Sequence, residues 1–154
     1  MVAALLVLWV AVLVVTLLGP SAEGPSWLVE TIASAAESVG IPPALAATDR
    51  VEFVLNALAF APVSLLGSLL WPRWTWRDWT AGGFVGSFLV EAFQALFLAA
   101  RSATYVDVVS NTLGALGGAI LAIALARALP RRVSEDGADL PYRAAPAQQG
   151  DVPG

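Results

Sequence analysis

The chain has 154 residues, of which 58% are hydrophobic and 13% charged, and its mean hydropathy is +0.74. Soluble domains average roughly 45 to 50% apolar and about 25% charged residues, so this composition predicts an integral membrane protein. The sequence contains no Cys and no His, which excludes disulfides, thiolate chemistry and zinc sites built from these ligands. We therefore expect no metal and no cofactor. A net charge of −4 without a basic cluster also argues against nucleic-acid binding.

The first apolar run covers residues 2–18 and carries no charged side chain. At about 1.5 Å per residue, a helix of this length crosses most of a hydrocarbon core of roughly 30 Å. A cleaved signal peptide is the alternative, but no basic segment precedes the run, and the "GPSAEG" that follows is a poor cleavage site. We predict an uncleaved first transmembrane helix over residues 1–18.

Residues 19–49 form a polar segment with four acidic residues and no Lys or Arg. Within this segment, Ser26 is predicted to cap a short helix that ends at Gly40, before two prolines. The apolar face of this helix would consist of Leu28, Ile32, Ala35 and Val39. We expect an extracytoplasmic loop that contains a short amphipathic helix at the membrane interface.

Three further apolar runs cover residues 53–72, 79–100 and 108–126, and each is long enough to span a bilayer. The first of them follows Glu52. The Trp- and Arg-rich joint "WPRWTWRDW" suits a loop at the level of the lipid headgroups. These runs predict an all-α polytopic membrane protein, with about four transmembrane helices in a bundle, a short extracytoplasmic interfacial helix, and a membrane core of three helices over 49–129.

Residues 130–154 lack an apolar period and are predicted to form a disordered cytoplasmic tail. Basic residues gather on the cytoplasmic side of membrane proteins. Here they lie between the second and third runs and after the fourth, whereas the first loop has none: Arg73, Arg77, Arg127, Arg131 and Arg132. We therefore predict that both termini are cytoplasmic.

Six polar or charged residues interrupt the last three apolar runs or lie at their ends: Asn56, Glu91, Gln94, Arg101, Asp107 and Asn111. The predicted orientation places them in the outer half of the bilayer. Helical phase puts Asp107 and Asn111 in one stripe with Gly114 and Gly118, and another stripe contains Gly83, Ser87, Glu91 and Gln94. Polar groups from three helices would therefore converge.

Glu91 is the acid deepest in a predicted span, where a charged side chain is expensive. We predict that it points inward toward Asn56 and Asn111 and is partly protonated. Polar residues between membrane helices often do no more than hydrogen-bond across the interface, and this purely structural role is the alternative. The set as a whole favours a functional site.

Small residues and one proline are predicted to shape the bundle. The Gly-x-x-x-Gly pairs Gly114/Gly118 and Gly82/Gly86 are typical of closely packed membrane helices. Pro62 removes the hydrogen bond to the carbonyl of Leu58 and is expected to kink the second span.

Several ordered motifs resemble the VanZ-like family of small bacterial membrane proteins: "DR" at 49–50, "NALAFAP" at 56–62, "EAFQ" at 91–94 and "RSATYVDVVSNTLG" at 101–114. The resemblance covers residues 49–126. It implies several transmembrane helices in the bacterial cytoplasmic membrane and a link to glycopeptide resistance, since the founding member lowers susceptibility to teicoplanin. Ser64 and Phe53 depart from the family pattern. Its motif positions fall on Asn56, Phe60, Pro62, Glu91, Gln94, Arg101, Asp107, Asn111 and Gly114.

Three classes of function fit these residues. The first is a pocket in the outer leaflet that binds or modifies a lipid-linked cell-wall precursor or a phospholipid. Its ligand-binding residues would be Asn56, Glu91, Gln94, Arg101, Asp107 and Asn111, with the Arg101 guanidinium on a phosphate or carboxylate.

The second class is an enzyme in which Glu91 and Asp107 act as general acid and base on a cell-wall lipid intermediate. The third is a small proton-coupled transporter that works as an oligomer and uses Glu91 as a proton relay. The sequence leaves open whether the protein is an enzyme.

Overall fold

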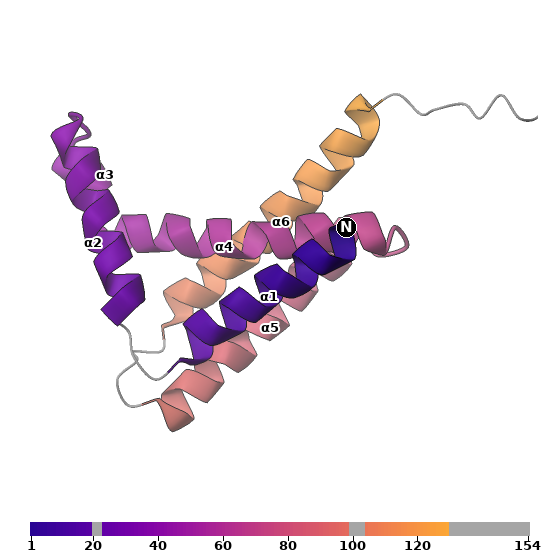
Figure 1. Ribbon diagram of the computed structural model, residues 1–154, viewed down its shortest axis with the longest axis horizontal. Coiled ribbons are helices and arrows are strands. Elements are labelled where there is room, and N and C mark those ends of the chain that lie inside the picture. The colour runs from indigo at the N-terminus through magenta and orange to yellow at the C-terminus, as the bar shows by residue number, and fades with distance from the viewer. Residues whose placement is uncertain (20–22, 99–103, 130–154) are drawn as a thin grey trace, which may run out of the picture.

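The computed structural model describes residues 1–19, 23–98 and 104–129, and all its regular structure there is helical. The six helices are α1 (Val2–Leu18), α2 (Glu23–Ser38), α3 (Pro43–Ala46), α4 (Thr48–Leu70), α5 (Trp76–Phe97) and α6 (Tyr105–Ala128) (Figure 1). The all-α class is confirmed. The predicted tail over 130–154 and Arg101 lie outside the described residues.

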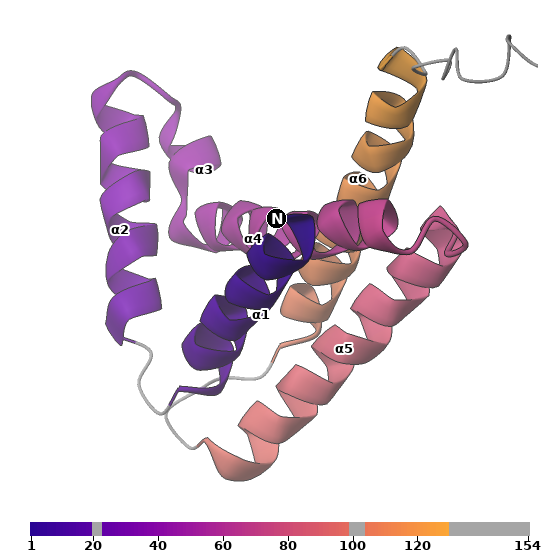
Figure 2. The same ribbon diagram turned by 45° about the vertical axis from the view of Figure 1, so that its right-hand side comes forward.

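Three of the helices, α4, α5 and α6, are long and apolar enough to cross a membrane. They correspond to the three predicted core spans. The 17-residue α1 is apolar but shorter, so its crossing of the bilayer stays a prediction. It packs against α4 and α5 (Figures 1 and 2), which makes it part of the same helix bundle.

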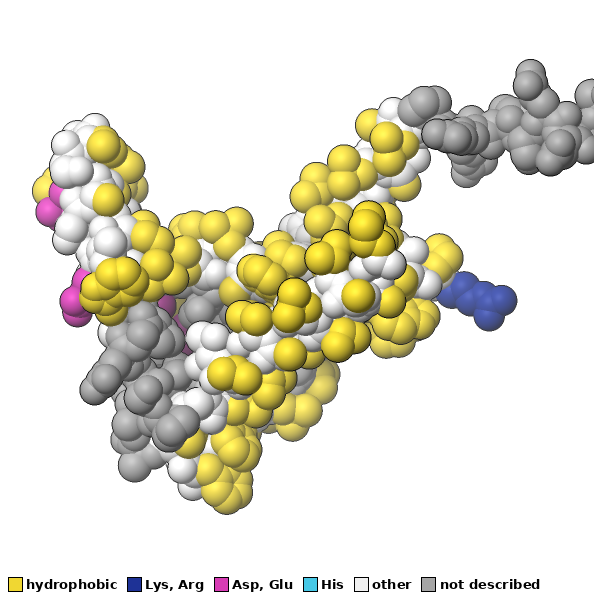
Figure 3. All heavy atoms as spheres, in the orientation of Figure 1, with side chains coloured by type: hydrophobic (Ala, Val, Ile, Leu, Met, Phe, Trp, Pro, Cys, Tyr) yellow, Lys and Arg dark blue, Asp and Glu magenta, His cyan; other side chains and the backbone are white. Residues whose placement is uncertain are grey.

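The surface of the bundle is largely apolar. Hydrophobic side chains cover most of the visible face of the bundle, as expected for helices that meet lipid (Figure 3). Basic side chains gather at the connection between α4 and α5, whereas acidic side chains lie on and beside α2 at the other end (Figure 3). The two ends of the bundle therefore differ in charge.

The closest helix contact joins α4 and α6 at two glycines. Gly114 lies against the backbone carbonyl of Ala57, and Gly118 against the carbonyl of Ala61 and the Ser64 hydroxyl. A Cβ atom at either glycine would collide with that backbone. Both glycines therefore lie where α4 and α6 approach each other closely.

The second predicted glycine pair behaves differently. A Cβ atom at Gly82 or Gly86 would meet no neighbour within 4 Å, so the prediction that this pair packs helices is wrong for the described chain. Gly83 instead faces Ala115 of α6. One residue rotates a helix by about 100°, so the inward stripe that contains Gly83 and Ser87 turns Gly82 and Gly86 outward.

The amphipathic helix starts earlier than predicted and packs through a different face. It begins at Glu23, so Ser26 lies inside the helix and is not its cap. The early start is possible because a proline such as Pro25 is tolerated in the first turn of a helix. The buried residue is Ala33, whereas Leu28 and Val39 are exposed. The predicted end is confirmed by Gly40, which has a φ of 89°.

Helix α4 continues through Pro62 from Thr48 to Leu70. The turn after it leads into α5, whose first turn is closed by a capping box: the Thr75 backbone N–H and hydroxyl donate to the Asp78 carboxylate at 2.7 and 2.8 Å. The Trp79 ring packs on Gly67. These contacts lie at the turn that joins α4 to α5.

Candidate functional site

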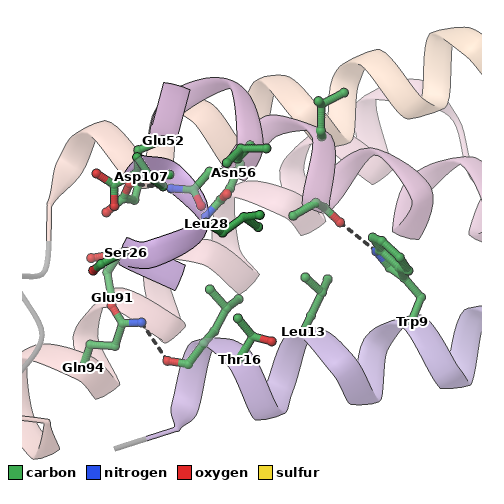
Figure 4. Close-up of a pocket in the computed structure, with 16 residues that line it drawn as sticks. Trp9, Leu13, Thr16, Ser26, Leu28, Glu52, Asn56, Glu91, Gln94 and Asp107 are labelled. Carbon is green, nitrogen blue, oxygen red and sulfur yellow. Dashed lines mark hydrogen bonds between the residues drawn. The ribbon is translucent and has the colours of Figure 1, made fainter. Parts of the chain in front are cut away.

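A cavity of about 610 Å³ lies at the end of the bundle where α4 and α6 begin and α1 and α5 end (Figure 4). One part of its lining is apolar and comes from α1, α2 and α4: Trp9, Leu13, Leu17, Leu28, Leu55 and Leu58. The other part is a polar cluster, by which we mean Glu52, Asn56, Glu91, Gln94, Asp107 and Asn111. Five of the six predicted ligand-binding residues therefore meet in one cavity.

Asp107 connects α6 to α4. One of its carboxylate oxygens accepts a hydrogen bond from the Asn56 amide at 2.7 Å (Figure 4). The other accepts from the Thr104 hydroxyl at 2.9 Å. Both oxygens of Asp107 are therefore engaged, and the predicted convergence of the second and fourth apolar runs rests on a direct bond.

Thr104 joins the two candidate catalytic acids. It caps α6, accepting a hydrogen bond from the Asp107 backbone N–H at 3.2 Å, while its own backbone N–H donates to Glu91 at 2.7 Å. Sequence analysis did not single out Thr104. The spacing of Thr104 and Asp107 is that of a capping box, and this signal would have identified it.

Glu91 is buried, as its predicted inward orientation requires, and lines the cavity together with Asn56 and Asn111. Its hydrogen bond, however, goes to Thr104 and not to either asparagine. The prediction is right about the direction of the side chain. It did not identify the partner, because helical phase fixes a face and leaves the contacts across it undetermined.

Asn111 connects α6 to α5 and is almost fully buried, with 2% of its surface exposed. Its amide nitrogen donates to the Ser87 hydroxyl at 2.8 Å. Its side-chain oxygen has no hydrogen-bond partner in the described part of the chain. Buried polar atoms are nearly always paired, so this oxygen is an exception.

Gln94, predicted to bind a ligand, holds the end of α1. Its amide donates to the Leu17 carbonyl at 2.8 Å (Figure 4). The last carbonyls of a helix lack intrahelical donors, so this bond satisfies one of them. A second bond, from the Trp9 indole to the Ala59 carbonyl at 2.8 Å, ties α1 to α4.

Glu52 is a cavity residue that sequence analysis placed only at the edge of a span. It lies on α4 four residues before Asn56, so the two share a helix face, and this spacing was the available signal. Glu52 is near enough to Asp107 for their charges to interact, and both interact with Glu91. Three acidic groups therefore face one weakly polar cavity, where like charges repel more strongly than in water.

The described residues contain no group of three or more acidic side chains arranged to hold a metal ion. The cavity does place both candidate acid–base residues, Glu91 and Asp107, in the wall of a space that a ligand would occupy. Their catalytic role stays a prediction.

Comparison with known proteins identifies one family. A family model described as VanZ/LLP1 matches residues 2–127. The match extends beyond the resemblance noted at 49–126 and takes in α1 and α2, which supply part of the cavity wall. No curated protein and no solved structure matches the chain.

Proposed function

This chain belongs to the VanZ/LLP1 family of membrane proteins, and from that premise we propose that its cavity binds or modifies a lipid-linked or other component of the bacterial cell envelope. The main support for this proposal is the composition of the cavity lining, which has an apolar part on α1, α2 and α4 and a polar cluster beside it. An amphiphile needs both, because its hydrocarbon chain contacts apolar side chains and its headgroup contacts polar ones.

The size of the cavity supports the same proposal. Sites for small molecules usually enclose about 300 to 1,000 Å³ and combine an apolar lining with a few convergent polar groups. The cavity has about 610 Å³ and fits this range. An acyl or prenyl chain would contact Leu13, Leu55 and Leu58, while the headgroup would meet the polar cluster.

We also propose that the polar cluster faces the outer leaflet of the cytoplasmic membrane and that both termini are cytoplasmic. The support is the distribution of charge: Arg73 lies in the connection between α4 and α5, Arg77 in the first turn of α5, and Arg127 in the last turn of α6. All three lie away from the helix ends that carry the polar cluster.

Single cysteines will test this orientation, because the chain has no cysteine of its own. We expect Val39→Cys, at a position that is 77% exposed, to react with a membrane-impermeant maleimide in intact cells. Trp74→Cys, at a position that is 52% exposed in the α4–α5 connection, should react only after permeabilisation. The reverse pattern would place the polar cluster on the cytoplasmic side.

A bulky side chain in the cavity will test the binding function. We expect wild-type protein purified in a neutral detergent to retain a defined amphiphile, detected by mass spectrometry, and Leu58→Trp to lose most of it because Leu58 lines the cavity. Leu69→Trp is the matched control, since Leu69 is also an exposed leucine of α4 but does not line the cavity. Equal retention by both variants would contradict the proposal.

The same two variants test the link to teicoplanin that the family resemblance implies. If the cavity mediates resistance, a sensitive host expressing wild type or Leu69→Trp will be less susceptible to teicoplanin than one expressing Leu58→Trp at equal membrane abundance. Equal susceptibility of all three strains would separate the cavity from this phenotype.

A further inference from the structure

A group of aromatic side chains lies at the connection between α4 and α5, at the end of the bundle away from the cavity. Trp71, Trp74 and Trp76 are 50%, 52% and 44% exposed. They lie where two helices that are long and apolar enough to cross a membrane meet their connecting turn. Tryptophan is enriched at the boundary between hydrocarbon and headgroups, because its ring is largely apolar while its N–H can donate a hydrogen bond. We therefore expect this turn to lie at that boundary.

A fourth tryptophan, Trp79, supports the exposed rings from inside the turn. Its own ring packs on Gly67 of α4. The centroid of this ring lies 5.0 Å from that of Trp74 and 6.3 Å from that of Trp71. Centroid distances of about 4.5 to 7 Å are typical of favourable aromatic contacts. The rings at this turn are therefore held by contacts with one another and with α4.

Two arginines accompany the aromatic rings. Arg73 lies in the connection and Arg77 in the first turn of α5, and both are exposed (Figure 3). The Arg77 guanidinium lies 5.3 Å from the centre of the Trp76 ring, which is within the range of a cation–π contact. The acidic residue beside them is Asp78, whose carboxylate accepts two hydrogen bonds from Thr75 and closes the first turn of α5. The carboxylate is thus engaged at the helix end, whereas both guanidinium groups are exposed beside aromatic rings.

We propose that these residues form a surface that binds the headgroups of anionic phospholipids in the leaflet that it faces. This turn surface consists of Trp71, Arg73, Trp74, Trp76 and Arg77. A guanidinium group matches the geometry of phosphate oxygens, while the glycerol region and the upper part of the acyl chains would contact the tryptophan rings. A zwitterionic headgroup has no net charge, whereas an anionic one is attracted by both arginines. The turn surface is separate from the cavity, so the inference does not depend on the proposed function.

Two phospholipids with the same acyl chains will test the lipid preference: phosphatidylglycerol, which is anionic, and phosphatidylcholine, which is zwitterionic. Their binding to the full chain would be measured by native mass spectrometry from neutral maltoside micelles at pH 7. We expect phosphatidylglycerol to bind at least about tenfold more tightly, because each arginine near a headgroup contributes to the attraction. The preference should shrink at high ionic strength. Equal affinity for the two lipids would overturn the inference.

Arginine variants test whether the preference arises at the turn surface. We expect Arg73→Gln and Arg77→Gln each to bind phosphatidylglycerol about fivefold less tightly and phosphatidylcholine as wild type does. Arg50→Gln is the matched control, since Arg50 is an exposed arginine in the first turn of α4, at the other end of that helix. It removes the same charge and should bind like wild type. An equal loss in Arg50→Gln would overturn the inference, because net charge alone would then attract the lipid.

A tryptophan variant tests the aromatic part of the turn surface without changing its charge. Trp76→Leu removes the ring beside the Arg77 guanidinium and should weaken phosphatidylglycerol binding by about two- to fivefold, the effect of an exposed cation–π contact. Trp27→Leu is the control, because Trp27 is 66% exposed but lies on α2. It should bind both lipids like wild type. Unchanged affinity in Trp76→Leu would overturn the turn surface as defined here, since charge alone would then explain the binding.

Discussion

Adding one methyl group at Gly118 is expected to lower the free energy of unfolding by about 2 to 3 kcal/mol, the upper part of the range for overpacked sites. A Cβ atom at this position collides with the Ala61 backbone carbonyl and the Ser64 hydroxyl. A side chain could rotate away, but a helical carbonyl moves only if α4 shifts. Gly118→Ala should therefore separate α4 from α6, the pair on which the cavity wall depends.

The neighbouring glycine provides the control. A Cβ atom at Gly117 meets nothing within 4 Å, so Gly117→Ala should be neutral or stabilise the helix by up to about 1 kcal/mol, the helix preference of alanine over glycine. Both variants would be unfolded in the same mixed micelles and followed by circular dichroism. If Gly117→Ala lowered the free energy of unfolding as much as Gly118→Ala does, the loss of a glycine, and not the α4–α6 contact, would explain the effect.

The stripes of α5 and α6 were predictable because helical periodicity depends on local geometry alone. Ser87, Glu91 and Gln94 are buried on one face of α5, and Asn111 and Gly114 on one face of α6, as the 100° rotation per residue requires. The apolar runs also predicted the three long helices. These features need no knowledge of which helices are neighbours.

The contacts between the stripes were not predictable in the same way. Whether Gly82 or Gly83 faces α6 depends on how α5 is rotated about its own axis within the bundle. The Gly-x-x-x-Gly spacing does not determine that rotation. The bond from Gln94 to the Leu17 carbonyl joins residues far apart in the chain, and its acceptor is a backbone atom that every residue possesses. No side-chain pattern could indicate it.

The contribution of α2 was missed for a related reason. The apolar spacing from Leu28 to Val39 indicates an amphipathic helix, yet in the structure Ala33 is buried, and Leu28 lines the cavity while 45% of its surface is exposed. In a membrane protein, an exposed leucine contacts lipid or a ligand at little cost. Hydrophobicity therefore does not distinguish the face that packs from the face that meets the bilayer.

The second large effect is expected at the bond between Asn56 and Asp107. Asp107→Leu should lower the free energy of unfolding by about 2 to 3 kcal/mol, because it leaves the Asn56 amide and the Thr104 hydroxyl without their acceptor. Asn56→Leu removes only one of the donors to Asp107 and should cost about 1 to 2 kcal/mol. Leucine is close in size to both residues, so the shape of the site is largely retained.

The double variant measures the bond itself. When both residues are leucine, the Asn56 amide and the Asp107 carboxylate are gone together, so the double variant should be less destabilised than the sum of the single variants by about 1 kcal/mol. Asn56→Leu combined with Thr80→Val is the control cycle, since the hydrogen bond of Thr80 within the described chain goes to the Trp76 carbonyl of its own helix. The changes in unfolding free energy of these two single variants should add to within about 0.5 kcal/mol. Additivity in the Asn56–Asp107 cycle as well would mean that the two side chains do not bond in the folded protein, and the polar end of the cavity would lose the contact that joins α4 to α6.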